Sequence, residues 1–334
     1  MTLVLDRDEV LKIYRMASQK EWVLPAFNAE NQTACEAILS AVYEYGQRIG
    51  INDLPVIIAI TNNYAHRPQS HYYTNTRNWQ LGLRFFLDDL RLLTSPISPF
   101  ADLQVMVHLD HIQWDTDTEL LNWDLHQFSS IMYDASALPF DMNIRKTAEF
   151  VKKNKDKIVI EGACDEIKES SAATDKGITT MEMAEKYFKQ TSVDLVVANL
   201  GTEHRAGEAS RKYYGDQARE ISKQIGPRLC LHGTSSVSHD QLSRLFDDGI
   251  RKVNIWTVLE RDSTAVLFHN MVKNASRLIG KEKVQELIRE GLLGEKIGTL
   301  PSLSVEYFTT AYRQNIIFNT MKGLVSHYLE LWYK

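Results

Sequence analysis

Short apolar runs alternate with longer amphipathic runs along most of the chain, and this alternation constrains the fold more than any other feature. Runs rich in Val, Ile and Leu are typical of the buried strands of a parallel sheet. They predict eight strands, at residues 22–27, 54–60, 103–109, 129–134, 157–162, 194–200, 228–233 and 251–256. Eight successive β-α units favour an α/β fold of the (β/α)8 TIM-barrel type. A doubly wound open sheet is the alternative, but the glycine fingerprint of a dinucleotide site is absent after the first predicted strand.

Helical patterns separate the predicted strands, and three further segments do not fit a plain repeat. Amphipathic helices are predicted at residues 31–49, 141–154, 181–191 and 238–249. Residues 61–101 make an unusually long second βα connection, and residues 163–180 have the small, polar composition of a mobile lid. Residues 280–334 predict two more helices, which cover a barrel face or pack against a partner subunit. We expect one domain, 1–334, with the barrel at about 20–278 and the helical extension at about 280–334.

Composition and charge favour a cytoplasmic protein and exclude several other classes. The 334 residues are 44% hydrophobic and 24% charged, with 38 Lys+Arg against 43 Asp+Glu. No basic excess therefore points to nucleic acid or an anionic membrane as a partner. No apolar run approaches the roughly 20 residues of a membrane span, and residues 1–22 form an amphipathic helical pattern rather than a signal peptide. Cys35, Cys164 and Cys230 are odd in number and widely spaced, which suggests neither a disulfide framework nor a CxxC metal site.

Polar and titratable residues stand where the predicted strands end. The carboxyl ends of barrel strands meet at one mouth, where we expect Asn28, Thr61, Asp110, His111, Asp134, Glu161, His204, His232 and Asn254. Burying such groups costs stability, so their repetition favours an active site over isolated core histidines or helix caps. Alternation along "VMVHLDHIQWD" (105–115) places His108 and Asp110 on one side of the third strand. It places Leu109 and His111 on the other side, until the chain turns.

Histidine-containing stretches follow three different predicted strands: "HLDH" (108–111), "LGTEHRAG" (200–207) and "LHGTSS" (231–236). Three neutral imidazoles with an open fourth position are typical of a catalytic zinc site. A buried structural histidine is the alternative for any one of them, but three at matching strand ends favour the metal. Nearby, "HGTSS" (232–236) and "NIWT" (254–257) offer small residues and backbone N–H groups that can hold an anion. Ordinary helix capping by Ser238 and Thr257 is the alternative there.

These stretches resemble the class II, metal-dependent ketose-bisphosphate aldolase family, which includes the fructose-bisphosphate aldolases. The resemblance covers roughly residues 8–275 in consistent order, through "VLPAFNAEN", "VHLDH", "SSIMYDASALPFDMN", "VIEGACDE", "VVANLGTEHRAG", "LCLHGTSS" and "NIWT". It implies reversible aldol cleavage of a ketose (bis)phosphate to dihydroxyacetone phosphate and an aldehyde, through a zinc-stabilised enediolate. It also implies a cytoplasmic enzyme of carbohydrate metabolism such as glycolysis, and a homodimer or homotetramer.

The resemblance assigns metal and catalytic roles residue by residue. His111, His204 and His232 match the zinc ligands of one divalent metal per chain, and a monovalent cation is a further expectation. Asp110 matches the proton donor to the aldehyde-derived oxygen during condensation, and Asn254 matches the contact to the enediolate.

Substrate-binding residues are assigned in the same way. Gly233, Ser235 and Thr257 match the grip on the phosphate of dihydroxyacetone phosphate, and we expect Asn28, Thr61 and Gly201 to line the substrate site. Glu161 matches the first glutamate of the family's "VEAELG" strand end and is expected to act in catalysis, whereas His108 supports its neighbours from the strand.

The chain departs from the family pattern at several positions around the predicted mouth. The departures are Ile112 for Gly, Ala163 for the second Glu, Arg205 for Gly, Trp256 for Asp, and "GTSS" (233–236) for "GGSG" or "GASG". The lid lacks the family's Gly-Gly-x-Glu-Asp signature, so Glu166 or Glu169 is the candidate acid/base there. Arg205 presents a planar fork suited to a carboxylate or second phosphate, with a solvated surface arginine as the alternative. We therefore expect a substrate other than fructose 1,6-bisphosphate.

Two other functions stay open at this point. The same three histidines could serve an epimerase or a hydrolase, although a hydrolase wants a bridging carboxylate or carboxylated lysine, and no predicted strand ends in Lys. A noncatalytic aldolase-like subunit is the third possibility. Such a degraded member is expected to lose a metal ligand or the proton donor, and this chain keeps all four.

Overall fold

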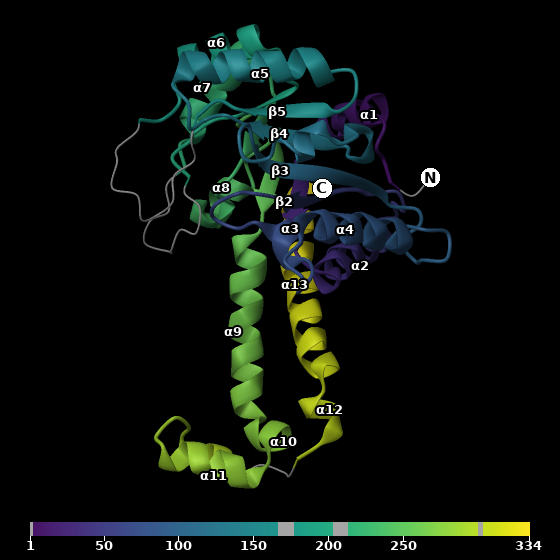
Figure 1. Ribbon diagram of the computed structural model, residues 1–334, viewed down its shortest axis with the longest axis vertical. Coiled ribbons are helices and arrows are strands. Elements are labelled where there is room, and N and C mark those ends of the chain that lie inside the picture. The colour runs from purple at the N-terminus through teal and green to yellow at the C-terminus, as the bar shows by residue number, and fades with distance from the viewer. Residues whose placement is uncertain (1–2, 166–176, 203–212, 300–302) are drawn as a thin grey trace.

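A closed barrel of parallel strands, in the order β1-β2-β3-β4-β5-β6-β7-β8, forms the centre of the molecule (Figure 1). The structure is a computed structural model that describes residues 3–165, 177–202, 213–299 and 303–334. The strands are β1 Leu24–Asn28, β2 Pro55–Thr61, β3 Gln104–Gln113, β4 Ser130–Asp134, β5 Val159–Ala163, β6 Leu195–Val197, β7 Leu229–Leu231 and β8 Ile250–Ile255. The predicted (β/α)8 TIM barrel and all eight of its predicted strands are confirmed.

Apolar side chains on both faces explain why these segments form buried strands. Every residue of β2 is buried, including the β-branched Val56, Ile57 and Ile58, which suit a pleated surface packed on both sides. β8 pairs with β1 and closes the barrel, with Ala26 opposite Asn254. The interior of a barrel this size is filled by side chains, normally branched apolar ones. Polar side chains inside it therefore need a specific explanation.

Helices cover the outside of the barrel between successive strands. They are α1 Arg7–Gln19, α2 Gln32–Ile49, α3 Gln69–Tyr72, α4 Trp79–Leu93, α5 Phe140–Asn154, α6 Met181–Thr191, α7 Gly215–Ile225 and α8 His239–Leu242, with 3-10 turns η1 Leu120–Asn122, η2 Leu125–Gln127 and η4 Thr234–Ser236. The helices predicted at 31–49, 141–154 and 181–191 are confirmed. The fourth, at 238–249, is helical only in α8. In the non-helical remainder of this range, Asp248 accepts a hydrogen bond from the Tyr213 hydroxyl (2.8 Å) and ion-pairs with Arg219.

A helical arm projects from the barrel (Figure 1). Its elements are α9 Thr257–Lys273, α10 Ala275–Ile279, α11 Lys281–Arg289, η5 Glu295–Thr299, α12 Val305–Phe308 and α13 Thr310–Trp332. The arm begins with α9, directly after β8 and well before residue 280, where the extension was expected to start. No helix in the described ranges is long and apolar enough to cross a membrane.

The last turns of α13 belong to the barrel's own packing. The Trp332 indole donates to the carbonyl of Leu242 (2.8 Å), and the Tyr333 hydroxyl donates to the carbonyl of Pro55 (2.5 Å). The Tyr333 ring lies 4.7 Å from that of Trp22, centroid to centroid, and all three aromatic residues are buried. The chain therefore leaves the barrel at α9 and is fastened to it again at the end of α13.

Candidate metal centre and active-site cleft

A bulge in β3 places two consecutive side chains in the same cleft. The pairing of β3 with β4 shifts register between Leu109 and Ile112, and His111 has a left-handed φ of 48°. A bulge of this kind re-aims a side chain, and a left-handed backbone at a residue other than glycine costs about 1–3 kcal/mol. Simple alternation, which predicts that His111 faces away from Asp110, therefore holds up to Asp110 and is wrong at His111.

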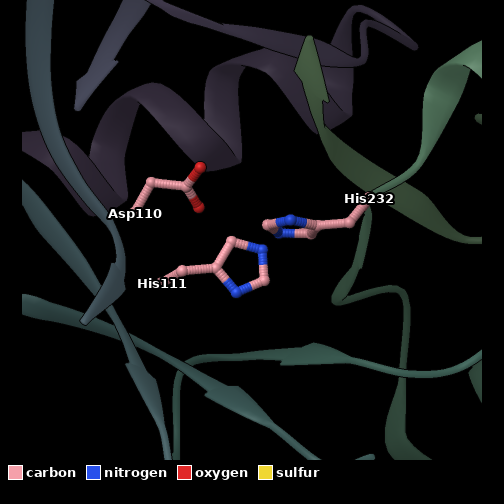
Figure 2. Close-up of side chains that lie close together, drawn as sticks. All are labelled: Asp110, His111 and His232. Carbon is pink, nitrogen blue, oxygen red and sulfur yellow. The ribbon is translucent and has the colours of Figure 1, made fainter. Parts of the chain in front are cut away.

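Asp110, His111 and His232 converge in the barrel (Figure 2). Their possible ligand atoms lie within 4.8 Å of one another, and the three side chains are buried. The rings of His111 and His232 are 4.9 Å apart, centroid to centroid, and nearly perpendicular at 81°. Two imidazoles beside a carboxylate in a buried pocket fit a divalent metal with borderline preference such as zinc. Burial lowers the pKa of His232, which favours the neutral imidazole that a metal needs.

Asp134, at the end of β4, holds the His111 ring. Its Oδ2 lies 3.0 Å from His111 Nδ1, which leaves Nε2 of the same ring for a metal. Burial would raise the pKa of Asp134, but hydrogen bonds from His111 and Ser136 lower it to about 2. On the other side the Tyr64 ring stacks on His111, with centroids 4.2 Å apart and planes 7° from parallel. The long second βα connection thus covers a metal-ligand candidate.

Asp110 lies between two side-chain amides that donate to its carboxylate. Asn28 Nδ2 donates to Oδ2 (2.8 Å), and Asn254 Nδ2 donates to Oδ1 (2.9 Å). Gln69 Oε1 lies 3.0 Å from Asn28 Nδ2 and so fixes which way that amide faces. Burial opposes ionisation, but His111, His232, His108 and Lys252 hold the pKa of Asp110 well below its usual range. The carboxylate is therefore ionised.

A layer of buried polar residues lies within the barrel beneath Asp110. Lys252 Nζ is 2.5 Å from Glu161 Oε1 and 3.1 Å from His108 Nε2, and all three side chains are fully buried. Burial and then Lys252 lower the pKa of His108 to about 3, so this ring is neutral, as suits a supporting residue. Glu161 Oε2 lies 4.0 Å from His232 Nε2, and Glu161 does not line the cleft. Its catalytic role stays a prediction, and its position suits support of His232.

The mouth of the barrel is a cleft of about 610 Å³, a volume that includes its open side. Nine of the sequence-predicted site residues line it: Asn28, Thr61, Asp110, His111, His232, Gly233, Ser235, Asn254 and Thr257. At the corner where a phosphate was predicted, Gly233 has a left-handed φ of 69°, and the Thr234 hydroxyl donates to the carbonyl of Asn254 (2.6 Å). No side chain caps the first turn of α9, whose first residue, Thr257, lines the cleft.

Other predicted residues lie elsewhere. Gly201, with φ of 83°, lies outside the cleft lining, and an added Cβ would meet the Tyr214 ring at 2.4 Å. It therefore supports the turn after β6. The predicted ligand His204, the predicted anion contact Arg205 and the lid candidates Glu166 and Glu169 lie outside the described residues, as does most of the predicted lid. Their roles stay predictions.

Several functional residues were missed by reasoning from the sequence. Tyr64, Arg67 and Gln69 reach the cleft from the second βα connection, where no periodic pattern indicated which side chains turn inward. The position of Lys252 could have been inferred from the sequence. It stands two residues before Asn254 in a buried strand, and residues two apart in a strand share one face.

The fold and the site define a (β/α)8 barrel enzyme with a candidate metal centre at the carboxyl ends of its strands. The chain belongs to the family "Fructose-bisphosphate aldolase class-II", whose family model matches residues 8–295. It is therefore a class II aldolase, a carbon–carbon lyase that performs metal-dependent aldol cleavage. Neither the epimerase or hydrolase nor the noncatalytic subunit is favoured.

Similar proteins support this assignment. A fructose-bisphosphate aldolase from Treponema pallidum is 27% identical over 246 residues, covering 67% of this chain and 68% of the relative. One from Giardia intestinalis is 33% identical over 233 residues, covering 67% of this chain and 64% of the relative. The crystal structure of a fructose-bisphosphate aldolase from Campylobacter jejuni superposes with a TM-score of 0.75 at 16% identity, covering 99% of this chain and 95% of that one. The last likeness concerns the fold alone.

Loss of the Asp134 carboxylate should weaken metal binding, because His111 then loses the partner of its Nδ1. We expect Asp134→Asn to lower metal affinity by about 10- to 100-fold, and His111→Ala, His204→Ala and His232→Ala to lower it further. Competition with a chromogenic chelator measures the affinity. Asp124→Asn is the matched control, since Asp124 pairs with His126 Nδ1 at 2.8 Å on the exposed surface. Full metal occupancy in all three histidine variants would contradict the assignment.

Proposed function

We propose that this enzyme reversibly cleaves a ketose phosphate to dihydroxyacetone phosphate and an aldehyde, with Zn²⁺ as its metal, in the carbohydrate metabolism of the cytoplasm. The observation that carries the proposal is the position of an ionised Asp110 directly beside His111 and His232. Proton transfer and metal binding then act on adjacent atoms of one small substrate.

Cleavage between C3 and C4 needs a base for the C4 hydroxyl and a sink for the electrons left on C3. Asp110 accepts the hydroxyl proton as the bond breaks and returns it to the aldehyde oxygen in condensation. A bound divalent metal would polarise the neighbouring carbonyl as a Lewis acid, held by His111, His232 and the predicted His204. Asn254, which faces the cleft beside Asp110, is positioned to contact the enediolate.

The phosphate is proposed to bind between η4 and the start of α9. Gly233, Ser235 and Thr257 all line this side of the cleft, and the left-handed backbone at Gly233 turns the chain into η4. Backbone N–H groups at a turn and a helix start are favourable partners for a phosphate dianion. We expect unphosphorylated dihydroxyacetone to be a poor substrate for the same reason.

Asp110→Asn should separate the two halves of the reaction. We expect kcat of cleavage to fall by roughly 10²–10⁴, as for a lost general acid/base, while bound metal and fold are kept. Exchange of the C3 proton of dihydroxyacetone phosphate should be affected less, because that step does not use the aldehyde oxygen. Deuterium incorporation followed by NMR measures exchange, and a coupled assay measures cleavage. A near-normal kcat in this variant would indicate that the proton carrier is not Asp110 but a residue of the predicted lid, Glu166 or Glu169.

Arg67 is proposed to supply positive charge to the anionic substrate. It is the sole Lys or Arg among the described residues of the cleft lining, and Glu30 fixes its guanidinium through Nε at 2.7 Å. It also lies over the Tyr72 ring, with Cζ 4.0 Å from the centroid. Arg205 stays a second prediction for the same task.

Removal of Arg67 should therefore weaken substrate binding more than turnover. We expect Arg67→Ala to raise KM for the phosphorylated substrate with little change in kcat, as for lost uniform binding. Arg77→Ala is the matched control, because Arg77 lies over the other side of the same Tyr72 ring at 4.2 Å but does not line the cleft. If KM and kcat of Arg67→Ala equal those of the unaltered enzyme, Arg67 does not bind the substrate and has a structural role only.

A homodimer through the helical arm is the proposed assembly. α9 is rich in apolar residues, yet it exposes 40% of Val266, 70% of Phe268 and 36% of Met271. Phe268 and Met271 are three residues apart and so share one face of the helix, and exposed apolar surface of this kind is typical of protein–protein contacts. We expect Phe268→Asp to shift the mass measured by light scattering from dimer to monomer. Leu92→Asp, at an exposed site at the end of α4, should leave the dimer intact. A monomeric or tetrameric unaltered chain would contradict the proposal.

A further inference from the structure

Lys252 is a lysine with no exposed surface in the interior of the barrel. Lysine is rarely buried to this extent unless it is paired. Its ammonium lies 2.5 Å from Glu161 Oε1, 2.8 Å from Asn254 Oδ1 and 3.1 Å from His108 Nε2. An ammonium has three donors and no acceptor, so Asn254 Oδ1 and His108 Nε2 both accept from it, and Glu161 pairs with it by charge. The Nδ1 of His108, 2.8 Å from the Ser130 hydroxyl, then carries the proton of the neutral ring.

The contact with Lys252 determines the orientation of the Asn254 amide. Because Lys252 can only donate, it takes the amide oxygen and leaves the NH2 group to face Asp110, where Nδ2 donates to Oδ1 at 2.9 Å. The flipped amide would set its NH2 against the ammonium and its oxygen against the carboxylate. Both contacts would then be repulsive in a site of low dielectric. Lys252 thus selects one of two amide orientations of similar shape.

The Asp110 carboxylate depends on this selection. Asn254 donates to one of its oxygens and Asn28 to the other, so the carboxylate plane is fixed from two sides. Asn28 is oriented by Gln69, whose Oε1 lies 3.0 Å from the Asn28 amide nitrogen. Two further side chains, Gln69 and Lys252, therefore set the two amides.

We propose that Lys252 is a positioning residue of the aldol reaction, which orients Asn254 and, through it, the carboxylate of Asp110. The inference rests on the proposed function. A buried ion pair such as Lys252–Glu161 is weak evidence for stability, because well-packed apolar residues of similar volume often stabilise a protein as well or better. The placement of Lys252 one pleat below Asn254 on β8 instead matches a role in geometry.

The test isolates the link between Lys252 and Asn254. Lys252→Met alone would leave Glu161 as an unpaired buried charge, so Lys252→Met is made in an E161Q background. The effect of Lys252 is the ratio of kcat in E161Q to kcat in E161Q/K252M. This ratio is measured with Asn254 present and again after N254A, which makes a thermodynamic cycle.

With Asn254 present we expect the ratio to be on the order of 10 or more, with KM changed less than kcat; after N254A it should be near 1. Equal ratios in the two backgrounds would overturn the proposal, because a general loss of packing acts independently of Asn254. Ser130→Ala is the control. It disturbs His108 in the same layer without touching Asn254 and should change kcat by less than about 2-fold. A loss as large as that of E161Q/K252M would also count against the proposal.

A crystal structure of the variants tests the positioning role of Lys252 independently of the proposed reaction. In crystals of E161Q/K252M we expect Asn254 Nδ2 to lie beyond hydrogen-bond distance of Asp110, whereas in E161Q the contact should persist. An unchanged Asn254 in E161Q/K252M would overturn the positioning role. Absence of both cleavage and dihydroxyacetone phosphate exchange in the unaltered enzyme would instead contradict the proposed function.

Discussion

The left-handed turn at His111 is the local constraint on which the candidate site depends. Without the bulge, β3 would direct Asp110 and His111 to opposite faces, and the metal ligand would lie among the helices outside the barrel. With it, one strand supplies both the proposed proton carrier and a candidate metal ligand. The cost of a strained backbone is typical of active sites, where the surrounding structure holds the strained residue in place. Here Asp134 and the stacked Tyr64 ring hold His111 from two sides.

The interior of the barrel is unusual in its polar content, and its charged groups contact one another. Lys252 lies against Glu161 and beneath Asp110, while Asp134 and Asp110 flank His111. Burial by itself would neutralise each of these groups. Their mutual contacts keep the carboxylates ionised, and Lys252 together with burial keeps His108 neutral. The polar layer thus fixes protonation states as well as positions, which an apolar layer of equal volume would not do.

The residues around the cleft come from two kinds of segment. The candidate metal ligands His111 and His232 and the proposed proton carrier Asp110 follow from strand ends, whose positions the barrel dictates, whereas Tyr64 and Arg67 come from the long second connection. Loops tolerate change that strands do not. The open side of the cleft is therefore built partly from a segment that can vary while the strand ends are kept. The arm starting at α9 is likewise attached at the mouth, so the proposed phosphate site and the exposed apolar side chains share one helix.

The sequence by itself determined the barrel and most of the residues of the cleft. Eight apolar runs separated by helical patterns leave few alternatives to a closed parallel sheet, and the convergence of its strand ends brought together residues as distant as Asn28 and Thr257. Three things required the tertiary structure: the side to which His111 points, the partners of Lys252, and the approach of Tyr64 and Arg67 to the cleft. A one-residue bulge reverses the face of every side chain after it, and its position depends on pairing with β4 rather than on local sequence. The partners of a buried ammonium and the path of a long loop are likewise set by strands and helices far away in the chain, which no local pattern records.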